Sequence, residues 1–298
     1  MTQQKPDSNK QTPQNSLSDL PYTDLLFIPD TELETELAAA LKNNCFELHL
    51  QPQVKLNNWS LAGVEALLRW QHPTYGVIPP EHFLPVLEQS GMLDELGHWV
   101  LQEACRLNKV WQDGGVAPLR IAINISASQW RHTKFHDTVM DILTTAGFTP
   151  AQLVFEIAEE GLMTESDRQL FERLRHHGIK LALNYTGKGL TSACDISDLP
   201  IDIIKIDKSL TQHIVNNRQD RSIMQTLLSF AHENKLEVIA EGVETAQQLL
   251  FLNALQCTTA QGFLLSHPLP IENFTALYQH DARFDYLIDK ISRQWQNR

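Results

Sequence analysis

The stretch "LALNYTGKGLTS", residues 181–192, shows the pattern from which the fold can be inferred, because it joins a strand-like run to a loop. Its first part is apolar, as a buried strand is. Its second part is punctuated by glycine, as a loop is. The polar pair Asn184-Tyr185 stands where the strand gives way to the loop. The same arrangement, an apolar run that ends at a polar residue before a helical pattern, recurs along the chain.

Short β-rich runs of this kind alternate with helical patterns from residue 46 to residue 266. Several of the helical patterns end in glycine, which favours the helix C-terminus. Strands that alternate with helices indicate parallel α/β architecture, and eight such units predict a closed, TIM-like (β/α)8 barrel. The runs are FELHLQP, LAGVEALLRW, RIAINIS, LVFEIAEE, IKLALNY, DIIKID, EVIAEGVE and AQGFLLS.

Composition excludes several classes of protein. The chain has 298 residues, a formal net charge of −12 and a pI near 5.4, which argues against nucleic-acid binding through a basic face. Its four cysteines form no C-x-x-C pair, so they are expected to be reduced and mostly buried in a cytoplasmic protein. We find no secretory signal and no apolar stretch of the ~18 residues that a membrane span needs.

Three regions are expected along the chain. Residues 1–30 are rich in Gln, Ser, Asn and Pro, which predicts a disordered N-terminal tail. Residues 31–275 contain the alternating pattern and form the barrel domain. Residues 276–298 are expected to form a C-terminal helical extension. From the length of this sequence we expect no further catalytic or sensory domain beside the barrel.

Polar side chains stand at the expected end of every strand. The active site of a β/α barrel lies at the C-terminal ends of its strands, so these side chains should converge. Carboxylate and amide oxygens suit Mg²⁺ or Mn²⁺, and a lysine suits an anion or a polarised water. Together they predict metal-assisted chemistry on a phosphate ester, although any single carboxylate at a strand end is more often a solvated loop residue. The residues are Gln51, Glu65, Asn124, Glu156, Asn184, Lys205, Asp207, Glu241 and Gln261.

These residues lie in recognisable frames: VEALLRW with Glu65-Ala66-Leu67, NIS at Asn124, FEIAEE, KID at Lys205, EGVE at Glu241 and QGF at Gln261. In this order the chain resembles the EAL-domain family of cyclic-di-GMP phosphodiesterases, from about Thr31 to Pro270. The resemblance implies a TIM-like barrel of the EAL type that has one antiparallel strand and holds two divalent metals.

The resemblance also implies a role for each matching position. Glu65, Asn124 and Glu156 match ligands of the first metal. Lys205 matches a lysine that contacts the attacking water, while Asp207 and Glu241 match acidic residues of the metal and water network. The catalytic set is then Glu65, Lys205 and Glu241. The ligand-binding set is Gln51, Glu65, Leu67, Arg69, Asn124, Glu156, Asp207, Glu241 and Gln261. Glu159 matches a glutamate that braces the loop after Tyr185.

The opening stretch departs from the family, which reads DDFGTGYSS where this chain reads NYTGKGLTS. Asn184 replaces an aspartate that bridges both metals, and Tyr185 replaces an aspartate that ligates the second metal. An amide is neutral, and a phenol with a pKa of about 10 is neutral at pH 7 and bulky where a metal should lie. Because two-metal catalysis needs both ions, hydrolysis is expected to fall by orders of magnitude. Lys188 either replaces metal charge or faces solvent.

Three functions follow from these residues. The first is a catalytically degenerate EAL protein that binds cyclic-di-GMP without a required cofactor and regulates an unidentified protein partner in bacterial signalling, such as biofilm formation or motility. The second is a nucleotide-independent scaffold that regulates a transcription or motility factor, which His267, in place of the family's arginine, leaves open. The third is a slow phosphodiesterase with one Mg²⁺ or Mn²⁺ at Glu65, Asn124 and Glu156. Homodimerisation stays open, because residues 191–202 are more acidic than in typical members.

Overall fold

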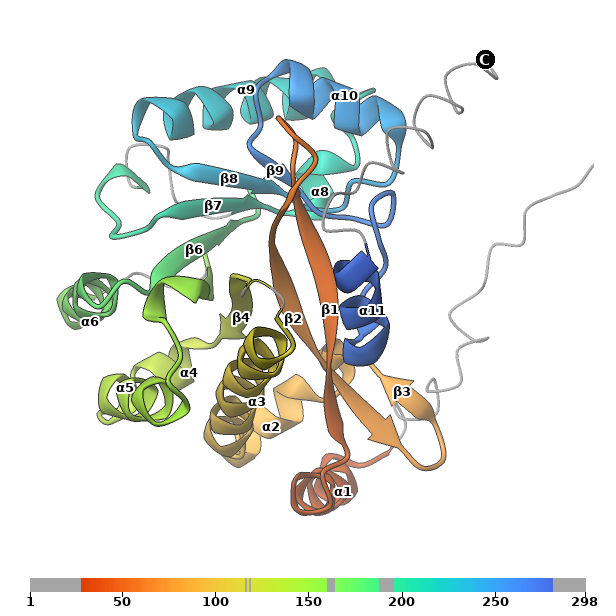
Figure 1. The fold of residues 1–298 in the computed structure, drawn as a ribbon, viewed down its shortest axis with the longest axis vertical. Coiled ribbons are helices and arrows are strands. Elements are labelled where there is room, and N and C mark those ends of the chain that lie inside the picture. The colour runs from red at the N-terminus through yellow and green to blue at the C-terminus, as the bar shows by residue number, and fades with distance from the viewer. Residues whose placement is uncertain (1–27, 116, 118, 160–163, 188–195, 281–298) are drawn as a thin grey trace, which may run out of the picture.

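The computed structural model describes residues 28–115, 117, 119–159, 164–187 and 196–280 (Figure 1). Its helices and strands are, in chain order, α1 (Asp30–Lys42), β1 (Phe46–Lys55), β2 (Leu61–His72), β3 (Gly76–Ile78), η3 (Pro80–His82), α2 (Leu84–Ser90), α3 (Leu93–Asp113), β4 (Ile121–Ile125), α4 (Ala127–Trp130), α5 (Phe135–Ala146), η4 (Pro150–Gln152), β5 (Leu153–Ala158), α6 (Glu165–His176), β6 (Lys180–Tyr185), β7 (Ile203–Ile206), α8 (Lys208–Thr211), α9 (Arg218–Glu233), β8 (Glu237–Ala240), α10 (Ala246–Ala254), β9 (Thr259–Ala260), β10 (Leu269–Pro270) and α11 (Ile271–His280).

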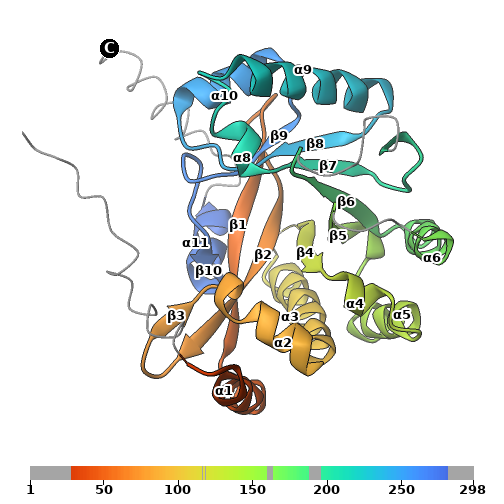
Figure 2. The same cartoon turned by 180° about the vertical axis from the view of Figure 1, so that it is seen from behind.

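Eight strands close into a barrel in the order β1-β9-β8-β7-β6-β5-β4-β2, and β1 pairs with β2 to complete the ring. Every neighbouring pair from β2 round to β9 is parallel. Strand β1 is antiparallel to both of its neighbours. Helices flank the strands on the outside (Figures 1 and 2). The predicted TIM-like barrel of the EAL type is therefore confirmed.

The interior of the barrel is built in layers, because alternate side chains of a strand point to the same face. A middle layer is apolar and almost fully buried, and consists of Ala122, Val154, Ala182, Ile203 and Ile239. The residues two positions further along the same five strands are Asn124, Glu156, Asn184, Lys205 and Glu241. Two residues beyond the apolar layer, each of these strands therefore contributes a side chain to a polar layer at the carboxyl end.

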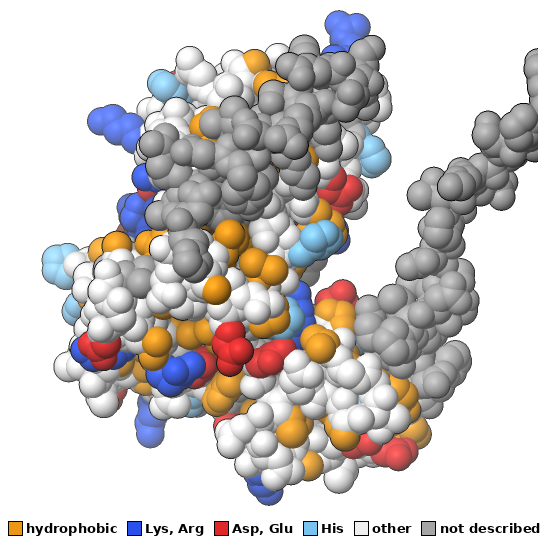
Figure 3. Space-filling model, turned by 45° about the vertical axis from the view of Figure 1, so that its right-hand side comes forward, with side chains coloured by type: hydrophobic (Ala, Val, Ile, Leu, Met, Phe, Trp, Pro, Cys, Tyr) orange, Lys and Arg blue, Asp and Glu red, His pale blue; other side chains and the backbone are white. Residues whose placement is uncertain are grey.

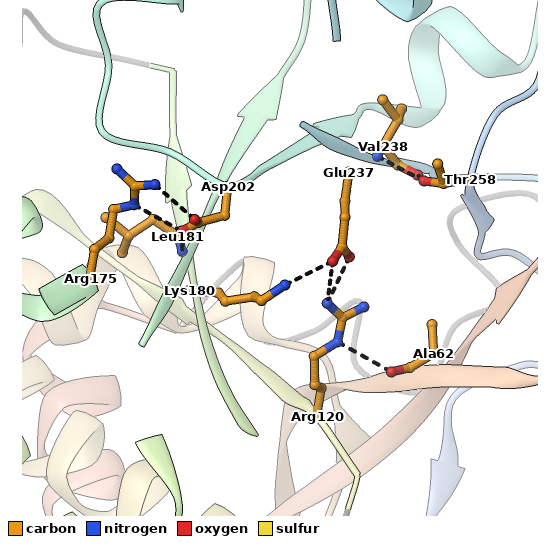
Figure 4. Close-up of polar contacts among 9 residues, drawn as sticks. All are labelled: Ala62, Arg120, Arg175, Lys180, Leu181, Asp202, Glu237, Val238 and Thr258. Carbon is orange, nitrogen blue, oxygen red and sulfur yellow. Dashed lines mark hydrogen bonds and ion pairs between the residues drawn. The ribbon is translucent and has the colours of Figure 1, made fainter. Parts of the chain in front are cut away.

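The amino end of the barrel holds a second polar layer, which we call the amino-end network (Figure 4). Glu237 accepts from Arg120 Nη1 at 2.7 and 2.9 Å and from Lys180 Nζ at 2.8 Å. Nearby, Arg175 binds both carboxylate oxygens of Asp202, at 2.9 and 3.1 Å. Arg120, Lys180 and Glu237 stand two positions before the apolar layer, so this layer separates the two polar ends.

A lobe extends from the barrel because β1 and β2 are longer than the other strands. Strand β3 pairs with the end of β2, and the aromatic residues Phe46, Trp70 and Phe83 pack beneath α1 and α2. In the space-filling view the lobe stands off from the body, with a hollow between them that shows hydrophobic and acidic side chains (Figure 3). The long hairpin also corrects one prediction, since Gln51 and Glu65 lie opposite each other within β1 and β2 and not at strand ends.

Helix α11 packs its buried Phe274 against the barrel core. Trp111 Nε1 donates to Thr275 Oγ1 at 3.0 Å, which ties the helix to α3. The helix begins at Ile271, before the extension expected from residue 276, and the expected extension beyond residue 280 lies outside the described residues, as do residues 1–27 of the expected tail. Within the described part of the chain, no helix has the length and apolar character that crossing a membrane requires.

Candidate functional site

The centre of the carboxyl end is a buried lysine surrounded by three glutamates. Lys205 is 1% exposed, and its Nζ lies 2.8 Å from Glu65 Oε2 and 2.6 Å from Glu241 Oε1. It also donates to Glu156 Oε2. These four residues come from β2, β5, β7 and the residue after β8, and we call them the Lys205 cage. The structure thus brings these side chains together at the carboxyl end of the barrel, as the strand pattern predicts.

The cage sets the charge of each member. Burial disfavours the charged lysine, but attraction to Glu156, Glu65 and Glu241 outweighs it and raises the pKa of Lys205 well above its usual range. Burial also raises the pKa of Glu156 well above its ordinary value, and repulsion from Glu65 adds to this. For Glu65 the attraction of Lys205 and several hydrogen bonds overcome burial, so its pKa is lowered. The single ammonium group of Lys205 therefore contacts carboxyl groups that differ in their pKa.

Glutamine side chains continue the network around Glu65. Gln261 Nε2 donates to Glu65 Oε2 at 2.5 Å and to Gln51 Oε1 at 2.9 Å. Gln53 Nε2 in turn donates to Gln261 Oε1 at 3.1 Å. Gln53 was missed by the sequence reasoning, although its spacing of two from Gln51 on one strand is a signal for a shared face.

Gly262 lets the chain after β9 approach its neighbour closely enough to place Gln261 there. A Cβ at this position would lie 2.3 Å from both the backbone N and the backbone O of Val243. Such distances are far inside van der Waals contact, so only glycine fits without a backbone shift. The close approach to the backbone of Val243 thus explains why a glycine follows Gln261 in the QGF motif.

Two oxygen atoms of the polar layer are buried without a hydrogen-bond partner. They are Glu156 Oε1, which belongs to the cage, and Asn184 Oδ1 on β6. Asn124 lies on the strand beside Glu156 in register with it, and its Nδ2 donates to Glu65 Oε1 at 2.9 Å. Unpaired buried acceptors are costly, so both oxygens favour a donor or a cation beside them.

The donors fit one hard cation better than two. In the ranges that the structure describes, no three His, Cys, Asp or Glu side chains are arranged to hold a metal ion, because the three glutamates turn to Lys205. The oxygens of Glu156 and Asn184, with the amide of Asn124, are hard ligands of the kind that Mg²⁺ and Mn²⁺ accept. One carboxylate and two neutral amides supply little charge, so a single, weakly held cation fits this set.

Tyr185 does not fill the mouth of the barrel, contrary to the expectation that its bulk would occupy a metal position. Strand alternation turns its side chain to the face opposite that of Asn184, where it packs against the core between strands and helices. Burial and the nearby Glu159 raise the pKa of its phenol. Tyr185 thus supplies no carboxylate to the site, and its phenol faces away from the cage.

Glu159 contacts the start of the loop after β6. Its Oε2 accepts from the backbone N of Thr186 at 3.0 Å and from Thr186 Oγ1 at 2.9 Å. Glu159 thus contacts the first residue of this loop, and its bracing role stays a prediction. Lys188, and residues 191–195 of the segment considered for dimerisation, lie outside the described residues.

The other predicted residues do not join the cage directly. Asp207 caps α8 by accepting from the backbone N of Ser209 at 2.8 Å. Arg69 Nη1 donates to the backbone O of Leu68 at 2.6 Å, and Leu67 lines the large cavity beside the site. His267 stacks on the half-exposed ring of Phe263, with the ring centroids 4.1 Å apart. Ser266, which the sequence reasoning missed, accepts from Gln51 Nε2 at 3.1 Å through its backbone O.

Known proteins are similar to this chain in sequence and in fold. The bifunctional diguanylate cyclase/cyclic di-GMP phosphodiesterase MucR of Pseudomonas aeruginosa is 37% identical over 247 residues, which cover 82% of this chain and 36% of that protein. The cyclic di-GMP phosphodiesterase NbdA of the same organism is 38% identical over 258 residues, which cover 85% of this chain and 33% of that protein. This chain thus spans about a third of the length of these curated relatives.

A solved structure described as the PaMucR phosphodiesterase in a c-di-GMP complex aligns with a TM-score of 0.77 at 37% identity, over 82% of this chain and 99% of that one. The family model described as the EAL domain matches residues 34–268, which span the barrel from α1 to the end of the loop after β9. The chain therefore belongs to the EAL domain family.

Proposed function

We propose that this chain is a cytoplasmic cyclic-di-GMP receptor that turns the nucleotide over orders of magnitude more slowly than an active phosphodiesterase. The observation that carries the proposal is Asn184 at the polar layer, followed by a tyrosine that faces away from it. A divalent cation would polarise the phosphate ester and activate water. Asn124, Glu156 and Asn184 would hold it, and this set offers only one carboxylate.

The residues that would contact the nucleotide support binding. Gln51 and Gln261 present amide groups beside the cage, and amides can pair with the donor and acceptor edges of a base. Arg69 offers a guanidinium, which suits a phosphate because of its forked donors. The relative described as a c-di-GMP complex binds this nucleotide in the same fold. Since such a receptor releases no product, we propose that it acts through contact with a protein partner.

A slow phosphodiesterase is the second candidate, and the unpaired oxygens of Glu156 and Asn184 favour it. They are hard donors that one Mg²⁺ or Mn²⁺ could use. Lys205 would then hold the carboxylates around the reaction. In this case binding and cleavage share one site, and the two candidates differ only in rate.

Restoring the carboxylates tests the proposal. The double variant Asn184→Asp/Tyr185→Asp should hydrolyse cyclic-di-GMP in Mg²⁺ at least about a hundredfold faster than the natural chain, since paired ions stabilise both reacting oxygens. Asn57→Asp adds a carboxylate at an exposed position and serves as the matched control. Chromatography of the nucleotide over time gives the rates. If the natural chain already matches the double variant, the receptor proposal is wrong.

A further inference from the structure

A cavity lies at the amino end of the barrel, opposite to the end that holds the Lys205 cage. It is formed by the end of β1, the starts of β2, β8 and β9, the segments that precede β4 and β5, and the end of α10. Its volume of about 760 Å³ falls within the range of about 300–1,000 Å³ that holds small-molecule ligands. The apolar layer separates this amino-end cavity from the carboxyl end, so a ligand here would not share the site described above.

One nitrogen of a guanidinium group in this cavity is unused. Arg120 lines the cavity, and its side chain is 18% exposed. Its Nη1 donates to Glu237, and its Nε donates to the backbone O of Ala62 at 3.3 Å. Its Nη2 makes no hydrogen bond to any residue that the structure describes (Figure 4). Because a guanidinium forms strong, charge-assisted hydrogen bonds to anions, this nitrogen is a donor for an anionic ligand.

The charge of the amino-end cavity is opposite in sign to that of the whole chain. Lys55 and Arg120 line it, and Glu237 is the one acidic residue among the described residues that do so. Glu237 is also bound by Lys180 Nζ at 2.8 Å, whereas Lys55 forms no ion pair with a described residue. Three cations thus accompany one carboxylate, in a chain whose net charge is −12. Such a local excess of positive charge attracts an anion, and a dianion most strongly.

Amide side chains also line the cavity. An amide offers both donors and an acceptor, so it can pair with a hydroxyl group in either direction. Gln152 uses its Oε1, which accepts from Asn108 Nδ2 at 3.4 Å, and the other amides form no side-chain hydrogen bond with a described residue. Together they fit a hydroxylated body attached to the anionic group. The amides that line the cavity are those of Asn57, Gln152, Asn253 and Gln256.

We propose that the amino-end cavity binds a small phosphate monoester with a hydroxylated body, such as a sugar phosphate or a polyol phosphate. A phosphate monoester carries a charge of about −1.5 to −2 at pH 7, which suits the excess of cations. Its oxygens would accept from Arg120 Nη2 and Lys55 Nζ, and its hydroxyl groups would pair with the amides. Arg120 and Lys180 keep their contacts with Glu237, so the amino-end network still holds the strands together.

Calorimetric titration of the natural chain with ribose 5-phosphate, at pH 7 and low ionic strength, tests the proposal. We expect saturable binding at one site that weakens as salt is added, because salt screens partly exposed charges. Ribose lacks the anionic group and should not bind. Inorganic phosphate lacks the hydroxylated body and should bind at least about threefold more weakly, since it loses the hydrogen bonds to the amides. The outcome does not depend on the receptor proposal, which a separate titration with cyclic-di-GMP tests.

Variants of opposite effect locate the site. Arg120→Met removes the unused donor and should weaken the binding of ribose 5-phosphate at least about tenfold. Glu237→Gln removes the carboxylate from the cavity and should strengthen binding about threefold or more, which a loss of structure would not do. Lys55→Met should weaken binding about threefold and serves if Arg120→Met does not fold. Lys134→Met makes the same change at an exposed position of the carboxyl end and should leave binding unchanged.

Four results would overturn the proposal. They are binding of ribose or of inorganic phosphate as tight as that of ribose 5-phosphate, binding without saturation, full affinity in both Arg120→Met and Lys55→Met, and weaker binding in Glu237→Gln.

Discussion

The two ends of the barrel differ in the ratio of cationic side chains to carboxylates. At the amino end, Arg120 and Lys180 share Glu237, and Arg175 pairs with Asp202 through two hydrogen bonds. At the carboxyl end, Lys205 alone faces Glu65, Glu156 and Glu241. None of the described amino-end side chains just named has a buried polar atom without a partner, whereas Glu156 Oε1 and Asn184 Oδ1 of the carboxyl-end polar layer are both buried and unpaired.

The difference separates a structural layer from a binding layer. Redundant cations at the amino end leave Glu237 paired even if one of them is lost, which suits a role in holding strands together. A single cation at the carboxyl end leaves acceptors unpaired, which suits a site that meets a ligand. The apolar layer of Ala122, Val154, Ala182, Ile203 and Ile239 lies between the two and keeps them apart.

Removal of Lys205 should have the largest effect on stability. Lys205→Met leaves three buried carboxyl groups without their cation, and breaking such a pair costs about 3–5 kcal/mol of the free energy of unfolding. Lys180→Met is the matched control at the amino end, where Arg120 continues to pair with Glu237, and should cost about 1 kcal/mol or less. Urea denaturation at pH 7 measures both. Equal losses would mean that the two ends do not differ in the proposed way.

A smaller, pH-dependent loss is expected for Glu237→Gln. Burial raises the pKa of Glu237, but Lys180 and Arg120 outweigh it and lower the pKa below its ordinary value. A lowered folded-state pKa stabilises the protein above the ordinary value and loses this effect as the pH falls. The variant should therefore lose about 1 kcal/mol at pH 7, a modest figure because the side chain is partly exposed. The deficit should shrink below about pH 4. A deficit that grows on acidification would contradict the assignment.

The smallest effect is expected at the edge of the amino-end network. Arg175 is partly exposed, so Arg175→Ala should cost about 0.5 kcal/mol. Asp202 still accepts from the backbone N of Leu181 at 3.0 Å in this variant. A shift in the thermal midpoint as large as that of Lys205→Met would show that the exposed pair is more important than its geometry indicates.

The barrel could be predicted from the sequence because its signals are local. Each strand is an apolar run, each helix has its own pattern, and the family motifs occur in a fixed order. The polar layer could also be predicted for β4 to β8, since Asn124, Glu156, Asn184, Lys205 and Glu241 close short strands whose ends coincide with the edge of the barrel.

Other features depend on contacts between distant segments and could not be predicted. The length of the β1–β2 hairpin placed Gln51 and Glu65 within strands, because the hairpin continues into the lobe. The orientation of Tyr185 follows from counting along β6, which needs the true strand bounds. The enclosure of Lys205 by three glutamates joins residues up to 176 positions apart (Glu65 to Glu241) and has no local signal.

The proposed receptor binds cyclic-di-GMP at the carboxyl end of the barrel but does not cleave it at an appreciable rate. Calorimetric titration of the natural chain with cyclic-di-GMP, once in EDTA and once in Mg²⁺, followed by chromatography of the recovered nucleotide, tests this claim most directly. We expect saturable binding in both buffers and intact nucleotide in Mg²⁺. No heat in either buffer would contradict binding and favour a nucleotide-independent scaffold, and linear product in Mg²⁺ would show that one metal at Asn124, Glu156 and Asn184 is enough for hydrolysis.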